Sequence, residues 1–254
     1  MTVFDRASFL RPIAHRGLHD RGITENSSPA FEAAIGKGFA IECDLRPAKN
    51  GLPVVFHDET LERVTGSSGA LAQHTTESLS GVHYADGSKV STFAELLQQT
   101  AGQVPLVVEI KSEWEPPDQA FLAEIARLAL AYSGPLALMS FDPGVMLVIR
   151  ALAPSIPRGI VSGTYKSEDG DTWWADKIDT NRAYRLAHLL ENGPVHPAFI
   201  AYDVKALQTP VTRFVREVLG LPVLTWTVRD ANDLAVARTW ADAPIFEGID
   251  PTLA

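Results

Sequence analysis

Residues 12–66 decide the fold, with the sequence PIAHRGLHDRGITENSSPAFEAAIGKGFAIECDLRPAKNGLPVVFHDETLERVTG. Short apolar runs in this stretch are followed or interrupted by side chains of the kinds that act in catalysis or bind ligands. His15 and Arg16 follow the first run, two carboxylates interrupt the second, and His57 follows the third. Functional side chains are often placed where a rigid strand ends. The pattern therefore predicts a site at the ends of several strands.

Two acids lie on one face of the second apolar run. In Ile-Glu-Cys-Asp-Leu, Glu42 and Asp44 point to the same side because side chains alternate along a strand. Two like charges on one face repel, so the arrangement is most easily explained by a cation between them. Glu109 and Lys111 share a face in a later run, VVEIK. The sequence thus supplies three carboxylates and two cationic side chains, Arg16 and Lys111, at predicted strand ends.

The second and third runs are joined by a turn that is too short for a parallel connection. Six residues separate Leu45 from Leu52, whereas a parallel crossover needs about a dozen or more. Asn50-Gly51 within this connection is a strong hairpin signal. An antiparallel hairpin would bring His57 back beside Asp44, with His15 at the same rim.

The rest of the chain alternates predicted strands with predicted helices. Ser28 and Pro29 are expected to begin the first helix, which ends at Gly38, and Thr92 with Glu95 forms a capping-box pattern. The expected barrel strands are residues 12–14, 39–45, 104–110, 135–140, 158–161, 198–202, 222–228 and 244–247. About eight strands in this alternation predict an α/β fold, a (β/α)8 barrel with the site at the C-terminal strand ends.

The segment 58–90 interrupts this alternation after the hairpin. It is rich in Gly, Ser and Thr and has only isolated apolar residues. We interpret it as a small insertion with few core residues, lying over one mouth of the barrel and shaping the pocket for the leaving group. The whole chain, residues 1–254, is then one domain.

Composition limits the classes of partner. The chain has 254 residues, of which 46% are hydrophobic, and a formal net charge of -9. An acidic protein is a poor default binder of nucleic acid or of anionic membranes. The sequence has no apolar run long enough to span a bilayer, no signal-peptide pattern, and one cysteine, Cys43, which is expected to be a small buried filler. These features favour a cytoplasmic location and leave the oligomeric state open.

The motifs resemble those of the glycerophosphodiester phosphodiesterase family in order and spacing. They are HRG at 15–17, EN at 25–26, IECD at 41–44, VVFHD at 54–58, LERVTG at 61–66, VVEIK at 107–111, SFDP at 140–143 and TWTV at 225–228. The resemblance spans nearly the whole chain, and residues 12–66 are its most specific part. It implies a phosphoric diester hydrolase of lipid and glycerol metabolism that converts glycerophosphodiesters to sn-glycerol 3-phosphate and an alcohol.

The metal site is expected at Glu42, Asp44 and Glu109. These residues offer only oxygen ligands, which suit one hard divalent ion, Mg²⁺ or Ca²⁺, and suit zinc poorly. Arg16 and Lys111 are expected to bind phosphate oxygens, and either could also form a structural ion pair with the acids.

His15 and His57 are the candidate acid and base, because an imidazole titrates near neutral pH and the family resemblance implies the same roles. The resemblance also implies attack by the substrate's own 2-hydroxyl to give a cyclic phosphate; direct attack by water stays open. Trp226 is expected to line the pocket against the glycerol carbons, with barrel core as the alternative. Phe141, Trp173 and Trp174 are weaker candidates for the pocket wall.

One position departs from the family pattern. Family members usually end with a segment like DGIITDYP, whereas this chain has Glu247 in the corresponding stretch, either at the mouth or as a cap of the barrel end. The remaining histidines are expected to be surface or structural residues: His19, His74, His83, His188 and His196. The alternative functions are a related phospholipase of the sphingomyelinase-D or phosphoinositide-specific type, and a catalytically silent binder of phosphorylated ligands.

Overall fold

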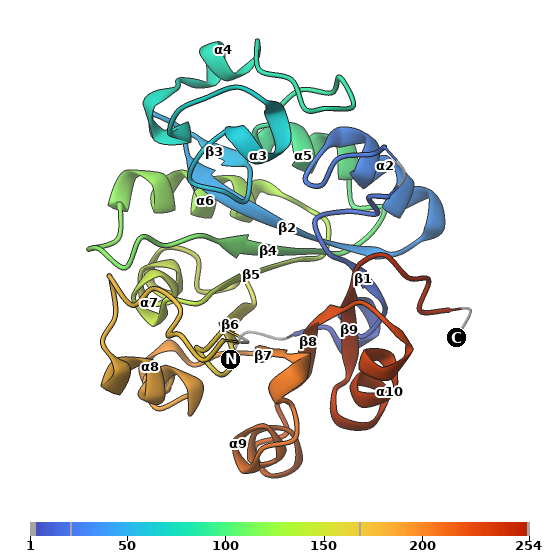
Figure 1. Ribbon diagram of the computed structural model, residues 1–254, viewed down its shortest axis with the longest axis vertical. Coiled ribbons are helices and arrows are strands. Elements are labelled where there is room, and N and C mark those ends of the chain that lie inside the picture. Colours follow the sequence, from blue (N-terminus) through green and yellow to red (C-terminus); the bar gives the residue numbers. More distant parts are fainter. Residues whose placement is uncertain (1–3, 21, 168, 253–254) are drawn as a thin grey trace.

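The computed structural model describes residues 4–20, 22–167 and 169–252, and in this part of the chain eight parallel strands close into a barrel (Figure 1). β1 (Ile13–Ala14) closes it by pairing with both β2 (Ala40–Pro47) and β9 (Ala243–Phe246). The other barrel strands are β4 (Leu106–Ile110), β5 (Leu136–Ser140), β6 (Arg158–Ser162), β7 (Phe199–Asp203) and β8 (Val223–Val228). The predicted (β/α)8 barrel is confirmed.

Helices connect successive strands and cover the outside of the barrel. They are α2 (Ser28–Lys37), α5 (Phe93–Thr100), α6 (Gln119–Ala131), α7 (Pro143–Leu152), α8 (Thr180–Ala187), α9 (Pro210–Arg213) and α10 (Ala231–Trp240). α2 is capped by Ser27, one residue before the expected cap, and ends at Gly38 as predicted. The Thr92–Glu95 capping box is present. α9 is continued by a π-helical turn, Phe214–Val218.

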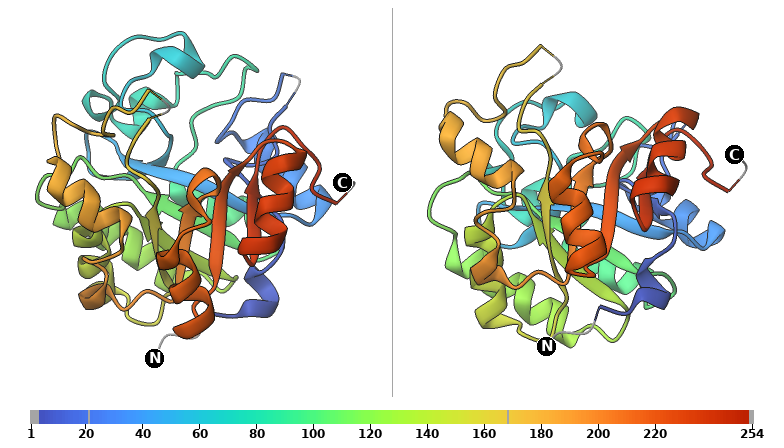
Figure 2. Two further views of the ribbon diagram at one scale, coloured as in Figure 1. Left: turned by 60° about the horizontal axis from the view of Figure 1, so that its bottom comes forward. Right: turned by 90° about the horizontal axis from the view of Figure 1, so that it is seen from below.

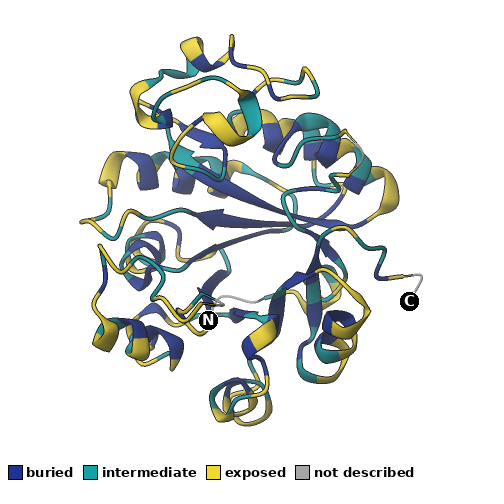
Figure 3. Cartoon of the chain, viewed as in Figure 1, coloured by how far each residue is buried: buried dark blue, intermediate teal, exposed yellow. Residues whose placement is uncertain are grey.

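Successive side chains along each strand point alternately into the barrel and toward the helices, and so form two apolar layers. Side chains such as Ile13, Val107 and Ala201 fill the barrel, whereas Ile41 and Val108 face the helices. Figure 3 shows the strands as buried and the outer faces of the helices as exposed. Cys43 is fully buried in the layer under the helices, as a small filler.

The N-terminal end of the barrel is closed by aromatic packing. α1 (Arg6–Phe9) carries Phe9, whose ring stacks on Phe4 at 4.7 Å between centroids, and Phe4 lies 4.9 Å from Phe199. The C-terminal strand ends are therefore the end at which side chains can meet a ligand.

The predicted hairpin follows β2. β3 (Pro53–Val55) pairs antiparallel with β2, with Leu45 opposite Val55, and Gly51 donates its backbone N–H to the Ala48 carbonyl in the turn. The backbone N–H of Phe56 donates to the carbonyl of Asp44. His57 therefore starts at the same level of the barrel as the acids on β2.

The segment 58–90 has its own apolar cluster, contrary to the expectation of few core residues. It contains α3 (Glu62–Thr65), a 3-10 turn (Leu71–Gln73) and α4 (Thr76–Leu79). The cluster consists of buried side chains of this segment and of the hairpin: Ala48, Val54, Phe56, Leu61, Leu71, Leu79, Val82, Tyr84 and Val90. Irregular spacing hid this cluster in the sequence, because it follows neither the helical nor the strand period.

Two long connections lie at the same end of the barrel. Figure 2 shows the segment 58–90 (cyan) and the loop before α8 (gold) beyond the strand ends. The ammonium of Lys177 joins them, at 3.2 Å from Glu59. None of the helices in the described ranges is both long and apolar enough to cross a bilayer.

Candidate active site

Three buried carboxylates meet inside the barrel. Glu42 and Asp44 project inward from β2, and the strand register places Glu109 of β4 directly beside Asp44. One carboxylate oxygen of each residue lies within 4.8 Å of the others. The residues are only 2%, 1% and 7% exposed, respectively. The structure thus brings together the three acids expected from the sequence.

Two of these carboxylates have cationic partners. Lys111 Nζ lies 2.8 Å from Asp44 Oδ1 and 2.7 Å from Glu109 Oε1, and Arg16 Nε lies 3.3 Å from Asp44 Oδ2. The amide of Asn26 also donates to Asp44 Oδ2, at 2.8 Å. Burial opposes ionisation of Asp44, but Lys111 and Arg16 hold its pKa well below the usual range. The expected structural ion pairs of Lys111 and Arg16 are therefore present.

The carboxylate of Glu42 differs from the other two in its partners. It accepts the backbone N–H of Arg16 at 3.0 Å, and among the described residues no lysine or arginine side chain forms an ion pair with it. Burial, and then the charges of Asp44 and Glu109, raise the pKa of Glu42 well above its usual value. A divalent cation fits this arrangement, because the three acids offer only oxygen ligands and one charge lacks a partner.

A tight turn after β1 directs Arg16 to these acids. Arg16 and Gly17 both have positive φ, +54° and +81°. A Cβ atom on Gly17 would lie 2.8 Å from Ala30 Cβ, so only glycine fits against α2. This turn explains why the residue after His-Arg is glycine.

The two histidines contact the same region from different elements. His15 Nε2 lies 3.9 Å from Glu42 Oε2, and its Nδ1 lies 2.9 Å from Glu247 Oε2. His57 Nδ1 lies 2.6 Å from Asp58 Oδ1. Burial lowers the pKa of His15 to about 4, although Glu247 opposes this shift. His15 is therefore neutral near pH 7 and able to accept a proton.

A chain of ion pairs connects His57 to Arg16. Asp58 accepts from Arg63 Nε at 2.5 Å, and Arg63 Nη1 donates to Glu25 Oε2 at 2.9 Å. Glu25 Oε1 accepts from Arg16 Nη1 at 2.6 Å. Burial opposes ionisation of Glu25, but the two arginines lower its pKa to about 2. These linked ion pairs hold both the imidazole of His57 and the guanidinium of Arg16 in place.

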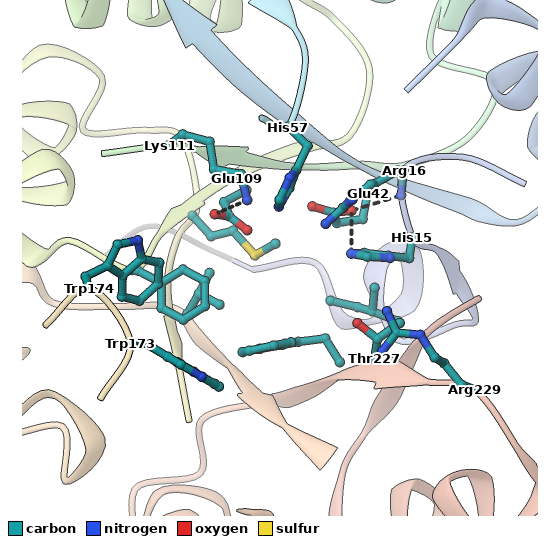
Figure 4. Close-up of a pocket in the computed structure, with 15 residues that line it drawn as sticks. His15, Arg16, Glu42, His57, Glu109, Lys111, Trp173, Trp174, Thr227 and Arg229 are labelled. Carbon is teal, nitrogen blue, oxygen red and sulfur yellow. Dashed lines mark hydrogen bonds and ion pairs between the residues drawn. The ribbon is translucent and has the colours of Figure 1, made fainter. Parts of the chain in front are cut away.

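These groups line one cavity of about 470 Å³ (Figure 4). Figure 4 shows His15, Arg16 and His57 near Glu42 and Glu109, and Trp173 and Trp174 on the other side. The lining residues are His15, Arg16, Glu42, His57, Glu109, Lys111, Met139, Phe141, Val161, Trp173, Trp174, Trp226, Thr227, Arg229 and Ile245. The cavity joins a charged face to an aromatic face.

The aromatic face comes from the barrel and from the loop before α8. Phe141 follows β5 and lies 5.1 Å from Trp174 and 5.5 Å from Trp226, measured between ring centroids. Trp173 lies 6.1 Å from Trp226. No residue of the segment 58–90, all of which the structure describes, lines the cavity. Aromatic residues form this wall of the cavity, and an effect of the segment 58–90 on the pocket for the leaving group stays a prediction.

Comparison with known proteins places the chain in a family. The model of the glycerophosphoryl diester phosphodiesterase family matches residues 15–246. The chain belongs to this family. The enzyme class expected from the sequence, a phosphoric diester hydrolase, is confirmed at the level of the family.

Similar proteins in the glycerophosphoryl diester phosphodiesterase family come from several organisms. A glycerophosphodiester phosphodiesterase of Caldanaerobacter subterraneus is 34% identical over 39% of this chain and 44% of its own length. One of Bacillus subtilis is 25% identical over 92% of this chain and 82% of its own length. The chain thus spans less than half of the first relative and most of the second.

A solved structure shows the same fold. A phosphodiesterase from Oleispira antarctica, solved in complex with the product sn-glycerol-3-phosphate, superposes with a TM-score of 0.74. It is 22% identical, and the match covers 95% of this chain and 94% of that protein.

Several site residues of this family member were not singled out from the sequence. Glu25 and Asp58 stand in the EN and HD motifs, so a signal was present. Arg63 stands in the LERVTG motif, whereas Arg229 had no signal, because its partner Glu247 lies 18 positions away. His19, expected to be a surface or structural residue, is partly buried, and a ring nitrogen lies within 4.8 Å of ligand atoms of His15 and Glu247.

Proposed function

We propose that this protein hydrolyses glycerophosphodiesters to sn-glycerol 3-phosphate and an alcohol, with one Mg²⁺ or Ca²⁺ held by Glu42, Asp44 and Glu109. The observation that carries the proposal is the convergence of this buried acid triad with His15 and His57 on one cavity. The product bound in the Oleispira antarctica relative supports the choice of sn-glycerol 3-phosphate.

The cationic groups recognise the phosphodiester. A divalent ion bound by the triad would compensate the negative charge that grows on the non-bridging phosphate oxygens. Arg16 and Lys111 line the same cavity and offer a guanidinium and an ammonium to these oxygens. Their ion pairs with Asp44 hold both groups at the base of the cavity. Such fixed charges stabilise the transition state without reorganisation.

The two imidazoles transfer the protons. One accepts the proton of the attacking hydroxyl, and the other donates a proton to the leaving alkoxide. Each Nδ1 contacts a carboxylate, Glu247 for His15 and Asp58 for His57, so each Nε2 is available to the substrate. The same pair would serve an attack by the glycerol 2-hydroxyl, with later opening of a cyclic phosphate, or an attack by water.

The aromatic wall holds the carbon atoms of the substrate. Trp226 lies on β8 at the cavity, and its indole N–H donates to the Ala201 carbonyl at 3.2 Å, which fixes the ring. We propose that the ring packs against the glycerol carbons, because an apolar face beside charged groups orients an amphipathic ligand. Trp173 and Trp174 would then face the leaving alcohol.

Three apolar side chains that are exposed do not support a lipid-surface phospholipase, because they lie away from the cavity. Phe214, Val218 and Leu219 are exposed, but they precede β8 and therefore lie at the N-terminal end of the barrel. They are remote from the mouth of the cavity. A cytoplasmic location stays a prediction.

The direct test is release of sn-glycerol 3-phosphate from glycerophosphocholine. Hydrolysis should stop in EDTA and return with Mg²⁺ or Ca²⁺. His15→Ala and His57→Ala should each lower kcat by about 100-fold to 10,000-fold. His188→Ala is the matched control, because His188 is exposed and does not line the cavity. Full activity of the His15→Ala, His57→Ala double variant would overturn the assignment, and activity in EDTA would overturn the metal.

A further inference from the structure

Glu247 follows β9 at the C-terminal end of the barrel, and the function proposed above gives it no part beyond its contact with His15 Nδ1. Its backbone N–H donates to the Val228 carbonyl at 3.0 Å, so its main chain continues the pairing of β8 and β9. The side chain is 27% exposed.

The barrel closure places Glu247 against His15. The backbone N–H of His15 donates to the carbonyl of Phe246 at 3.0 Å, so β1 and β9 are in register up to these residues. The side chains then meet, with His15 Nδ1 at 2.9 Å from Glu247 Oε2. Main-chain pairing thus fixes a contact between residues that are 232 positions apart.

Arg229 holds the carboxylate in this position. Arg229 Nη2 donates to Glu247 Oε2 at 3.0 Å, the same oxygen that contacts His15. The hydrogen bond from His15 and the burial that opposes it together leave the pKa of Glu247 lowered to about 2. Glu247 is therefore ionised near neutral pH, and the imidazole is the donor in this contact.

The other histidine has the same arrangement. His57 Nδ1 contacts Asp58, and Asp58 accepts from Arg63. Both imidazoles are therefore followed by a carboxylate and then by an arginine. The pair at His57 is adjacent in sequence, whereas the pair at His15 is assembled only by the closed barrel.

We propose that Glu247 is a positioning residue for His15, an inference that rests on the proposed function. The Nδ1–H of His15 donates to Glu247, which fixes the ring and the tautomer. Nε2 then carries the lone pair and faces Glu42, at 3.9 Å from Oε2. During attack the O–H bond of the nucleophile breaks and an Nε2–H bond forms. The imidazolium keeps its proton on Nδ1, and the ionised Glu247 stabilises its charge.

The same donor atoms do not favour a second metal. His15, His19 and Glu247 could in principle hold an ion, since their ligand atoms lie within 4.8 Å of one another. However, the Glu247 oxygen that meets His15 already accepts from Arg229, whose positive charge repels a cation. Positioning of His15 explains both contacts of this oxygen.

The test compares Glu247→Gln, Glu247→Ala and Glu247→Asp with the wild-type protein. Glu247→Ala should lower kcat for glycerophosphocholine about 100-fold, Glu247→Gln about 10-fold, and Glu247→Asp least, all with KM within about twofold. Glu217→Gln is the matched control, because Glu217 pairs with Arg213 on the surface away from the cavity. Unchanged kcat in Glu247→Ala, or a loss confined to KM, would overturn the proposal.

Nitrogen NMR of histidine-labelled protein provides a readout that does not depend on activity. The His15 signals, identified by their absence in His15→Gln, should show the Nδ1–H tautomer in the wild type. They should shift toward the Nε2–H tautomer or a mixture in Glu247→Ala. An unchanged tautomer would refute the positioning role, even if hydrolysis were seen. Failure of the wild type to hydrolyse any glycerophosphodiester would instead refute the proposed function, and the tautomer would still be measured.

Discussion

The ammonium of Lys111 lies 2.8 Å from the carboxylate of Asp44 in the barrel interior. It lies equally close to Glu109, at 2.7 Å, so one buried cation serves two buried anions. Glu42 is left as the acid whose charge is not balanced. Because one buried negative charge lacks a cationic partner, we expect the site to bind a divalent ion.

Loss of Lys111 should destabilise the metal-free protein. In Lys111→Met, Asp44 and Glu109 lose their shared partner in the interior, and breaking a buried ion pair costs about 3–5 kcal/mol. Urea unfolding in EDTA measures this loss, and Mg²⁺ should restore part of it. Lys177→Met is the control, because Lys177 pairs with half-exposed acids. Equal losses of unfolding free energy in the two variants would show that the buried ion pairs of Lys111 stabilise the protein no more than the exposed pairs of Lys177.

Replacement of Glu42 should raise the thermal stability of the metal-free protein and lower that of the metal-bound protein relative to wild type. Glu42→Gln removes the uncompensated charge, so the variant should unfold at a higher temperature than wild type in EDTA. With saturating Mg²⁺ the order should reverse, because only the wild type gains metal-binding energy. Thermal unfolding under both conditions measures this. A wild type that is more stable than the variant already in EDTA would contradict the interpretation.

The ion pairs of Glu25 should make stability depend on pH. Its pKa is lowered to about 2 from an ordinary 4.5, so the ionised form stabilises the fold above pH 4.5. This contribution is lost as the pH falls from 4.5 toward 2. Glu25→Gln should therefore lower the free energy of unfolding near neutral pH by about 2 kcal/mol, a value reduced for the half-exposed Arg63. The difference should shrink across that window, and a constant difference would be inconsistent with the assignment.

Gly17 should tolerate no side chain. In Gly17→Ala the new side chain would have a strained positive φ and would lie 2.8 Å from Ala30 Cβ. We expect the free energy of unfolding to fall by about 3 kcal/mol. Gly51→Ala is matched in φ, at +74°, but has no atom within 4 Å, and should lose about 1 kcal/mol. Denaturant unfolding of both variants separates the clash from the backbone strain. Equal losses would show that packing against α2 is unimportant.

The local pattern predicted much of the site. Strand alternation was enough to place Glu42 and Asp44 on one inward face, and the Asn50-Gly51 turn was enough to bring β3 back along β2. Both features depend on residues close in sequence, for which the strand period and turn chemistry hold. The parallel register then aligned Glu109 with Asp44.

Contacts set by barrel closure could not be predicted in the same way. The pairing of His15 with Glu247 depends on β1 meeting β9, and Arg63 meets Glu25 across 38 residues. The aromatic wall combines Phe141, which follows β5, with tryptophans from a loop that has no periodicity. Such contacts depend on three-dimensional packing, which cannot be predicted from the spacing of residues along the chain.

We expect Glu42, Asp44 and Glu109 to hold one divalent ion that hydrolysis requires. Titration with Mn²⁺, followed by electron paramagnetic resonance, counts bound ions directly, and glycerophosphocholine hydrolysis is measured on the same samples. We expect one tightly bound Mn²⁺ per chain, loss of that site in Asp44→Asn, and hydrolysis that rises with occupancy. Unchanged Mn²⁺ binding in Asp44→Asn, or full hydrolysis in protein free of bound metal, would show that these three acids do not hold an ion that hydrolysis requires.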